Sequence, residues 1–189
     1  MKKTELQIEL DKFKNYVVSQ AKSNLTRQHK NSSKALYNSI GGRVKANPNS
    51  FEMEFWMEEY GIYQDKGVKG KDPSKVSKNA RIRGQQAPNS PYRFGSGKVK
   101  NYDGFILSLE KWIKRKHIRL RDEKGKFKKG SVKTLSHIIA GNVYNRGLAP
   151  SLFFTKPFEK AYKKLPDDLV EAFGLDAIKL FNESIYLVK

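Results

Sequence analysis

The sequence predicts an α+β fold in which a small antiparallel β-sheet is packed by long N- and C-terminal helices. Apolar residues recur at helical spacing at both ends of the 189-residue chain, and they alternate with a period of two close to residue 50. Between these regions lies a long basic stretch that combines loop and helix. The length fits one domain over residues 1–189, with residues 64–148 as a basic insertion, or arm, within it.

The first predicted element is an amphipathic helix over residues 4–25. Thr4 and Gln7 have the spacing of a capping box, in which each side chain bonds the backbone N–H of the other residue. A shorter helix follows, with Ser32 or Ser33 as its N-cap. The apolar stripe of the first helix is formed by Leu6, Leu10, Phe13, Val17, Ala21 and Leu25.

A β-hairpin is expected over residues 43–60. Residues 43–47 form its first strand and residues 51–60 its second, with a turn at Pro48–Ser50 between them. The alternation along the second strand is typical of a half-buried antiparallel strand, so its glutamates face solvent or a basic neighbour. The inward face consists of Phe51, Met53, Phe55 and Met57, and the outward face of Glu52, Glu54, Trp56 and Glu58.

The segment "YGIYQDKGVKG", Tyr60–Gly70, poses a choice between a phosphate site, a catalytic centre and a turn. It lacks the Gly-x4-Gly-Lys-Ser/Thr spacing that aims successive backbone N–H groups at a phosphate. We therefore expect Tyr60 and Tyr63 to close the second strand. Gly67 and Gly70 are expected to turn the chain into an extended arm.

A long loop and two helices are predicted within the insertion. Residues 64–104 hold six Gly and three Pro without periodicity, which is typical of a loop. One helix is expected over residues 104–117. A second, capped by Ser131, covers residues 131–146. Between the two helices we expect a turn or short hairpin around Gly125.

Two further helices are expected at the C-terminal end. Pro157 lies near the first turn of one of them, where its missing N–H costs no hydrogen bond. The other begins at Pro166–Asp168, whose two aspartates complement the helix dipole. Gly174 is a candidate break within this last helix.

Positive charge is concentrated in the middle of the chain. The net charge is +19, and residues 64–133 hold 21 Lys and Arg against 6 Asp and Glu. This excess predicts a polyanion or an acidic protein as partner, the alternative being a solvated lysine-rich loop. The aromatic residues within it favour non-specific nucleic-acid binding, in which rings stack on bases or anchor the loop; they are Tyr92, Phe94, Tyr102 and Phe127. The contact candidates are Lys66, Lys69, Arg81, Arg83, Lys114, Arg115, Lys116, Lys126, Lys128 and Lys129.

Catalysis has little support in the residue pattern. The chain has no cysteine, which excludes disulfides, thiol nucleophiles and cysteine-ligated metals, and its three histidines lie far apart in the sequence. Glu58, Glu59 and Asp65 could formally supply the carboxylates of a nuclease, so this alternative stays open. We expect a protein that is not an enzyme and holds no cofactor or metal. No apolar run has the length of a membrane span, so we also expect a soluble protein.

Three short motifs follow one another in a recognisable order. The first is "SKALYNSI", Ser33–Ile40; the second is "YGIYQDKGV", Tyr60–Val68; the third begins at Pro157–Phe158. This order resembles the tail-completion proteins, also called neck or head–tail connector proteins, of tailed bacteriophages. Members have a Ser/Thr-Gly-x-Leu-x-x-Ser-Ile segment, then strands ending in Tyr-x-x-Tyr-x-Glu-x-Gly-Thr, then a Pro-Phe pair before the C-terminal helix. The departures here are Lys34 for the glycine, Asp65 for the glutamate and Val68 for the threonine.

The resemblance, which covers about residues 1–68 and 150–185, implies a structural virion protein without catalysis. Such a protein forms a homo-oligomeric ring of six or twelve copies at the head–tail junction, links portal or adaptor to tail proteins and surrounds the path of the genomic DNA. It is made in the host cytoplasm and located in the virion neck or tail. The insertion is larger than the family's usual loop, so ring size, position in the neck, the type of tail and the partner of the arm stay open. The alternative function is a non-specific nucleic-acid-binding protein.

Overall fold

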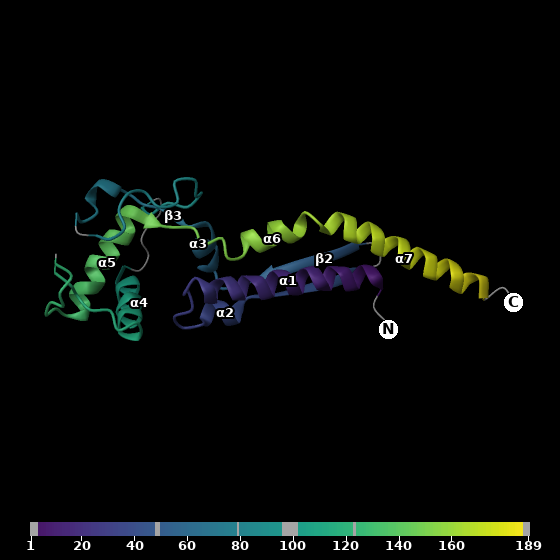
Figure 1. The fold of residues 1–189 in the computed structure, drawn as a ribbon, viewed down its shortest axis with the longest axis horizontal. Helices are drawn as coiled ribbons and strands as arrows, with labels where there is room; N and C mark the ends of the chain where they lie inside the picture. Colours follow the sequence, from purple (N-terminus) through teal and green to yellow (C-terminus); the bar gives the residue numbers. More distant parts are fainter. Residues whose placement is uncertain (1–3, 48–49, 79, 96–101, 123, 187–189) are drawn as a thin grey trace. The chain divides into compact units, whose positions relative to one another are not determined.

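The computed structural model describes residues 4–47, 50–78, 80–95, 102–122 and 124–186, shown as a ribbon in Figure 1. Within these residues the fold is α+β, as predicted, with seven α-helices and two small antiparallel sheets. The chain forms two compact units. Met1–Glu59 and Phe153–Lys189 make up the first, called here the terminal unit, and Tyr60–Leu152 make up the second, called the insert unit.

Helix α1 (Glu5–Arg27) of the terminal unit begins as predicted. The Thr4 side chain accepts a hydrogen bond from the Gln7 backbone N–H, and the Gln7 side chain accepts one from the Thr4 N–H, both at 3.2 Å. This reciprocal pair satisfies two N–H groups that have no partner within the helix. The apolar stripe of α1 is buried at Leu10, Phe13, Val17, Ala21 and Leu25.

The core of the terminal unit joins α1 to the short helix α2 (Ala35–Ser39). Ala21, Leu25, Leu36, Ile40 and Phe153 form one buried cluster. The predicted serine N-cap of α2 is wrong, because Lys34 occupies that position in a left-handed conformation, with φ 59°. Ser33 lies one residue before the N-cap, and its Oγ accepts the Ala35 backbone N–H at 3.4 Å.

The predicted hairpin is present as strands β1 (Gly41–Asn47) and β2 (Ser50–Trp56), paired antiparallel with Gly41 opposite Trp56. Pro48 and Asn49 of the expected turn lie outside the described residues. The second strand ends at Trp56 rather than at residue 60, and Phe51 near the turn is 39% exposed. The middle of β2 is therefore better buried than its end near the turn.

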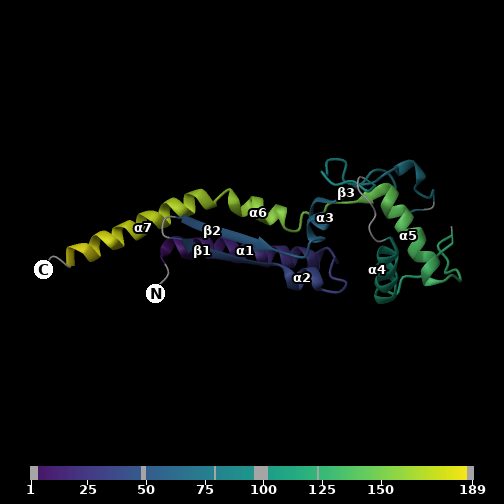
Figure 2. The same ribbon diagram turned by 180° about the vertical axis from the view of Figure 1, so that it is seen from behind.

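Two C-terminal helices, α6 (Thr155–Tyr162) and α7 (Leu165–Tyr186), complete this unit. Figures 1 and 2 show α1 lying along the hairpin, and α6 and α7 both pack on α1. Phe158 of α6 meets Phe13 of α1 and Phe55 of β2, with ring centroids 5.6 and 6.0 Å apart. α7 continues through Gly174 without a break. An aromatic cluster thus joins helix, hairpin and C-terminal segment.

The insert unit opens with a helix where the sequence analysis expected the end of a strand. Residues of "YGIYQDKGVKG" form α3 (Gly61–Lys66), followed by Gly67 at φ 72° and β3 (Val68–Lys69). The backbone carbonyls of Gln64 and Asp65 accept hydrogen bonds from Ser151 and Leu152 at 3.2 and 3.0 Å. These long-range partners satisfy the last carbonyls of a helix too short to be stable alone.

The stretch after α3 is folded, in the part that the structure describes, rather than extended as an arm. It contains only the short 3₁₀ turn η1 (Pro73–Lys75) beyond β3. Lys71 and Gln86 donate backbone N–H bonds to the carbonyls of Tyr144 and Arg146, at 3.0 and 2.7 Å. The loop therefore caps the C-terminal end of a helix, which explains why its sequence has no period of its own.

That helix is α5 (Val132–Arg146), which packs against α4 (Tyr102–Arg115) and leads into β4 (Gly147–Leu148). Ser131 caps α5 as predicted, since its Oγ accepts the Thr134 N–H at 3.0 Å. β4 pairs antiparallel with β3, with Val68 opposite Leu148. The core of this helix pair includes Ile106, Ile113, Leu135 and Ala140.

Candidate nucleic-acid interface

All ten predicted contact residues lie in the insert unit, and nine of them are exposed. The exception is Lys69, which is half-buried in β3 because its backbone pairs with the segment around Arg93. This unit holds 22 of the 38 Lys and Arg but only 6 of the 19 Asp and Glu, so it carries +16 of the net +19. Concentrated charge on one unit is the electrostatic footprint of a polyanion binder.

The structure brings one group of candidates together around β3. Lys66 is the last residue of α3, and Lys69 follows in β3. Gln85, next to the loop that carries Arg81 and Arg83, bonds both backbone groups of Gly70, with its side-chain oxygen 2.6 Å from the N–H. The four basic residues therefore come from two segments that are fastened to each other.

The other six candidates lie along a continuous segment that joins α4 to α5. Lys114 and Arg115 end α4, and Lys116 follows directly. The chain then forms a tight reversal, with Arg121 and Phe127 opposite each other as an antiparallel bridge and Gly125 at φ 79° in the turn. We call residues 119–122 and 124–129 the basic hairpin. Its exposed basic side chains are Arg119, Arg121, Lys124, Lys126, Lys128 and Lys129.

Arg119 and Arg121 were not among the predicted contact candidates, although both lie in the basic hairpin beside them. Both guanidinium groups lie over the ring of Phe127, with Cζ 5.7 and 4.3 Å from the ring centroid. The sequence pattern that could have indicated them is the alternation Arg-Leu-Arg before "DEKGKF". It places the two arginines on one side of a short strand and the aromatic residue on the partner strand.

Two of the predicted stacking aromatics anchor the loop. Tyr92 packs edge-on against Tyr63, with centroids 4.8 Å apart, and Phe94 lies 5.6 Å from Tyr144 of α5. The side chain of Tyr102 lies outside the described residues. Phe127, by contrast, is 63% exposed. Of the aromatic residues placed here, Phe127 is thus the one that projects among basic side chains at the surface.

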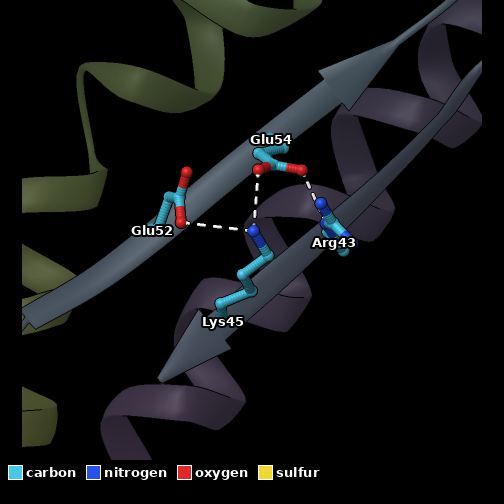
Figure 3. A network of polar contacts seen from close by, with 4 residues as sticks. All are labelled: Arg43, Lys45, Glu52 and Glu54. Atoms are coloured by element: carbon cyan, nitrogen blue, oxygen red, sulfur yellow. Dashed lines mark hydrogen bonds and ion pairs between the residues drawn. The ribbon is translucent and has the colours of Figure 1, made fainter. Parts of the chain in front are cut away.

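The glutamates of the hairpin face basic neighbours, one of the two outcomes expected from the sequence. Glu54 lies between Arg43 and Lys45, with N–O distances of 2.5 and 3.0 Å, and Lys45 also reaches Glu52 at 3.4 Å (Figure 3). The hydrogen bond from Arg43, with that from Lys45, lowers the pKa of Glu54 to about 2. Cations of the terminal unit are therefore partly neutralised by its own acids.

The three acids that could formally serve a nuclease, Glu58, Glu59 and Asp65, differ in exposure. Asp65 is 4% exposed at the end of α3, while Glu58 and Glu59 are exposed after β2. Among the residues that the structure describes, no group of three His, Asp or Glu side chains could hold a metal ion. None of the described helices is both long and apolar enough to cross a membrane.

Comparisons with known proteins add no relative. A scan against protein-family models and searches of curated proteins and of solved structures each found no match. The function is therefore argued from the residues of this chain and from the resemblance described above.

Proposed function

We propose that this chain is a structural protein of a tailed-bacteriophage virion that forms a ring at the neck, links portal or adaptor to tail, and surrounds the DNA path. The motif order supports this proposal, and the first and third motifs meet in the terminal unit, while the second lies in the insert unit. Leu36 and Ile40 of the first motif share a core with Phe153, which precedes the third motif, and Phe158 of the third motif packs on Phe13. Residues of the first and third motifs thus contribute to the packing of one unit.

The observation that carries the proposal is an exposed apolar face on α7. Val170, Phe173 and Ile178 are 74%, 67% and 58% exposed, and helical spacing places them with Ala177 on one side of the helix. The opposite side holds buried Ala172 and packs on α1. Contiguous exposed apolar surface marks protein–protein contacts, because burying it gains about 25 cal/mol per Å². Contact with other copies in a ring would cover this face.

The test is light scattering of the purified chain over a range of concentrations, at low and high salt and with and without duplex DNA. The proposal expects a discrete oligomer that forms without DNA and without metal. Val170→Ser with Phe173→Ser should shift it to the 21.7 kDa monomer. The matched control replaces two exposed apolar residues of the insert unit, Leu107→Ser with Ile138→Ser, and should leave the oligomer intact. Equal effects of both pairs would contradict the role given to α7.

The second candidate is a non-specific nucleic-acid-binding protein, favoured by the +16 charge of the insert unit. In that case the chain stays small by itself and forms a complex with DNA whose mass depends steeply on salt. The two functions therefore differ in one readout, which is self-assembly in the absence of DNA.

A further inference from the structure

We propose that the basic hairpin is a docking surface for the phosphate backbone of duplex DNA. This inference deepens the proposed function, on which it rests for its setting, by naming the part of the chain that meets the polyanion.

The basic hairpin carries an excess of positive charge, because the sequence of residues 119–129 has six Lys and Arg against Asp122 and Glu123. Six exposed Lys and Arg lie within eleven residues, and three more, Lys114, Arg115 and Lys116, precede them at the end of α4. The Asp122 carboxylate accepts the backbone N–H of Lys126 at 2.8 Å, so it is fixed within the turn. Its backbone also bonds Lys126 and Gly125. The one described acid of the hairpin therefore serves to shape it, while the cations point to solvent.

Arg121 is held in place by two contacts within the basic hairpin. Arg121 Nη1 donates to the Gly125 carbonyl at 2.9 Å while its guanidinium lies 4.3 Å from the Phe127 centroid. This contact uses one of five N–H donors, and the planar fork of the group matches phosphate oxygens. Arg119 stands over the same ring. Two like charges beside one ring repel each other, and a shared phosphate backbone would relieve that repulsion.

The position of Arg119 and Arg121 over the Phe127 ring also favours one kind of polyanion. A single strand is held by bases stacked on free aromatic faces. Here two guanidinium groups lie over the Phe127 ring, which is 63% exposed, so a base would have to compete with these arginines for the ring. What the hairpin presents to a ligand is a row of cations, which suits the dense and regular charge of duplex DNA. Single-stranded DNA and acidic protein are the other outcomes of the test.

The experiment measures the affinity of the full chain for a fluorescent mixed-sequence duplex by anisotropy, from 50 to 200 mM NaCl. Removing two phosphate contacts by Arg119→Gln with Arg121→Gln should lower the slope of log K against log salt by about 1.8 and weaken binding at least about tenfold. The charge-matched control, Lys156→Gln with Lys160→Gln on α6 of the terminal unit, should keep the wild-type slope. Arg119→Lys with Arg121→Lys should also keep it.

Several results would overturn the inference. The first is an unchanged salt slope in the Arg119→Gln with Arg121→Gln variant. The second is binding of oligo(dT) that is tighter than binding of duplex and that is lost in Phe127→Leu, which would point to base stacking. Competition by polyglutamate at equal charge concentration would point to an acidic protein instead. If the double arginine variant does not fold, Lys128→Gln with Lys129→Gln gives the same test and the same expected slope change.

Failure of this inference and failure of the ring proposal are distinguishable. The hairpin variants are expected to keep the oligomer seen by light scattering, whereas the α7 variants are expected to lose it. A variant that loses DNA affinity but still forms the oligomer tests the role of the basic hairpin and leaves the ring proposal unaffected.

Discussion

Asp176→Ala removes a carboxylate that joins the two ends of the terminal unit. Asp176 lies in the middle of α7, and its oxygens accept the backbone N–H groups of Glu5 and Leu6 at 2.9 and 3.1 Å. These N–H groups belong to the first turn of α1, where no helical carbonyl is available to them. The Thr4 side chain serves the next donor, Gln7, so it does not replace Asp176.

The expected cost of Asp176→Ala follows from these two bonds. A side-chain cap of a helix N-terminus contributes about 0.5–2 kcal/mol, and a negative charge at that end adds about 0.3–1 kcal/mol. The bonds are part-buried, so water replaces the carboxylate only partly. We therefore expect the free energy of unfolding to fall by about 2 kcal/mol. Asp176→Asn should cost less, because an amide oxygen can keep one bond.

The assay is urea unfolding at pH 7 followed by circular dichroism. Glu171→Ala is the matched control, since it removes an exposed acid from the same helix. It should change the free energy of unfolding by no more than about 0.5 kcal/mol. If Asp176→Ala and Glu171→Ala differ by less than that, α7 does not cap α1 in solution and the reasoning is refuted.

Two further predictions concern the hairpin and the insert unit. Because the folded pKa of Glu54 is lowered to about 2, its ion pair stabilises the protein above the ordinary carboxyl pKa, and this contribution is lost as pH falls from about 4.5 to 2. Urea midpoints over that range should fall less steeply in Glu54→Gln, and parallel curves would contradict this. Gly70→Ala should destabilise the protein by about 1–3 kcal/mol, because the added Cβ would overlap the backbone of Asn145 and Arg146. The control is Gly141→Ala in α5, where an added Cβ would meet nothing within 4 Å, so this change should stabilise the protein by about 0.5–1 kcal/mol in calorimetry. If Gly70→Ala destabilises the protein by no more than Gly141→Ala stabilises it, the backbone does not approach Gly70 closely.

The elements that the sequence predicts well are those with local signals. The capping box at Thr4 and the N-cap at Ser131 act on N–H groups three residues away, so both helix starts could be read directly. The hairpin followed from its period of two. The exposure of nine of the ten basic candidates also followed from residue type, since Lys and Arg side chains lie mostly at the surface.

The features that sequence reasoning missed depend on distant partners. α3 is fixed by bonds to Ser151 and Leu152, and the loop of the insertion by the carbonyls at the end of α5. The Asp176 cap spans 171 residues. No periodicity or motif predicts such contacts, because they depend on tertiary packing rather than on neighbouring residues in the sequence.

Whether copies of this chain close into a ring can be seen by electron microscopy of negatively stained protein. The sample is the purified chain at a concentration where light scattering gives an oligomer. We expect closed rings with a central opening and six- or twelve-fold class averages, and we expect none in the Val170→Ser with Phe173→Ser variant. Isolated 21.7 kDa particles at every concentration, or open filaments in place of rings, would contradict it.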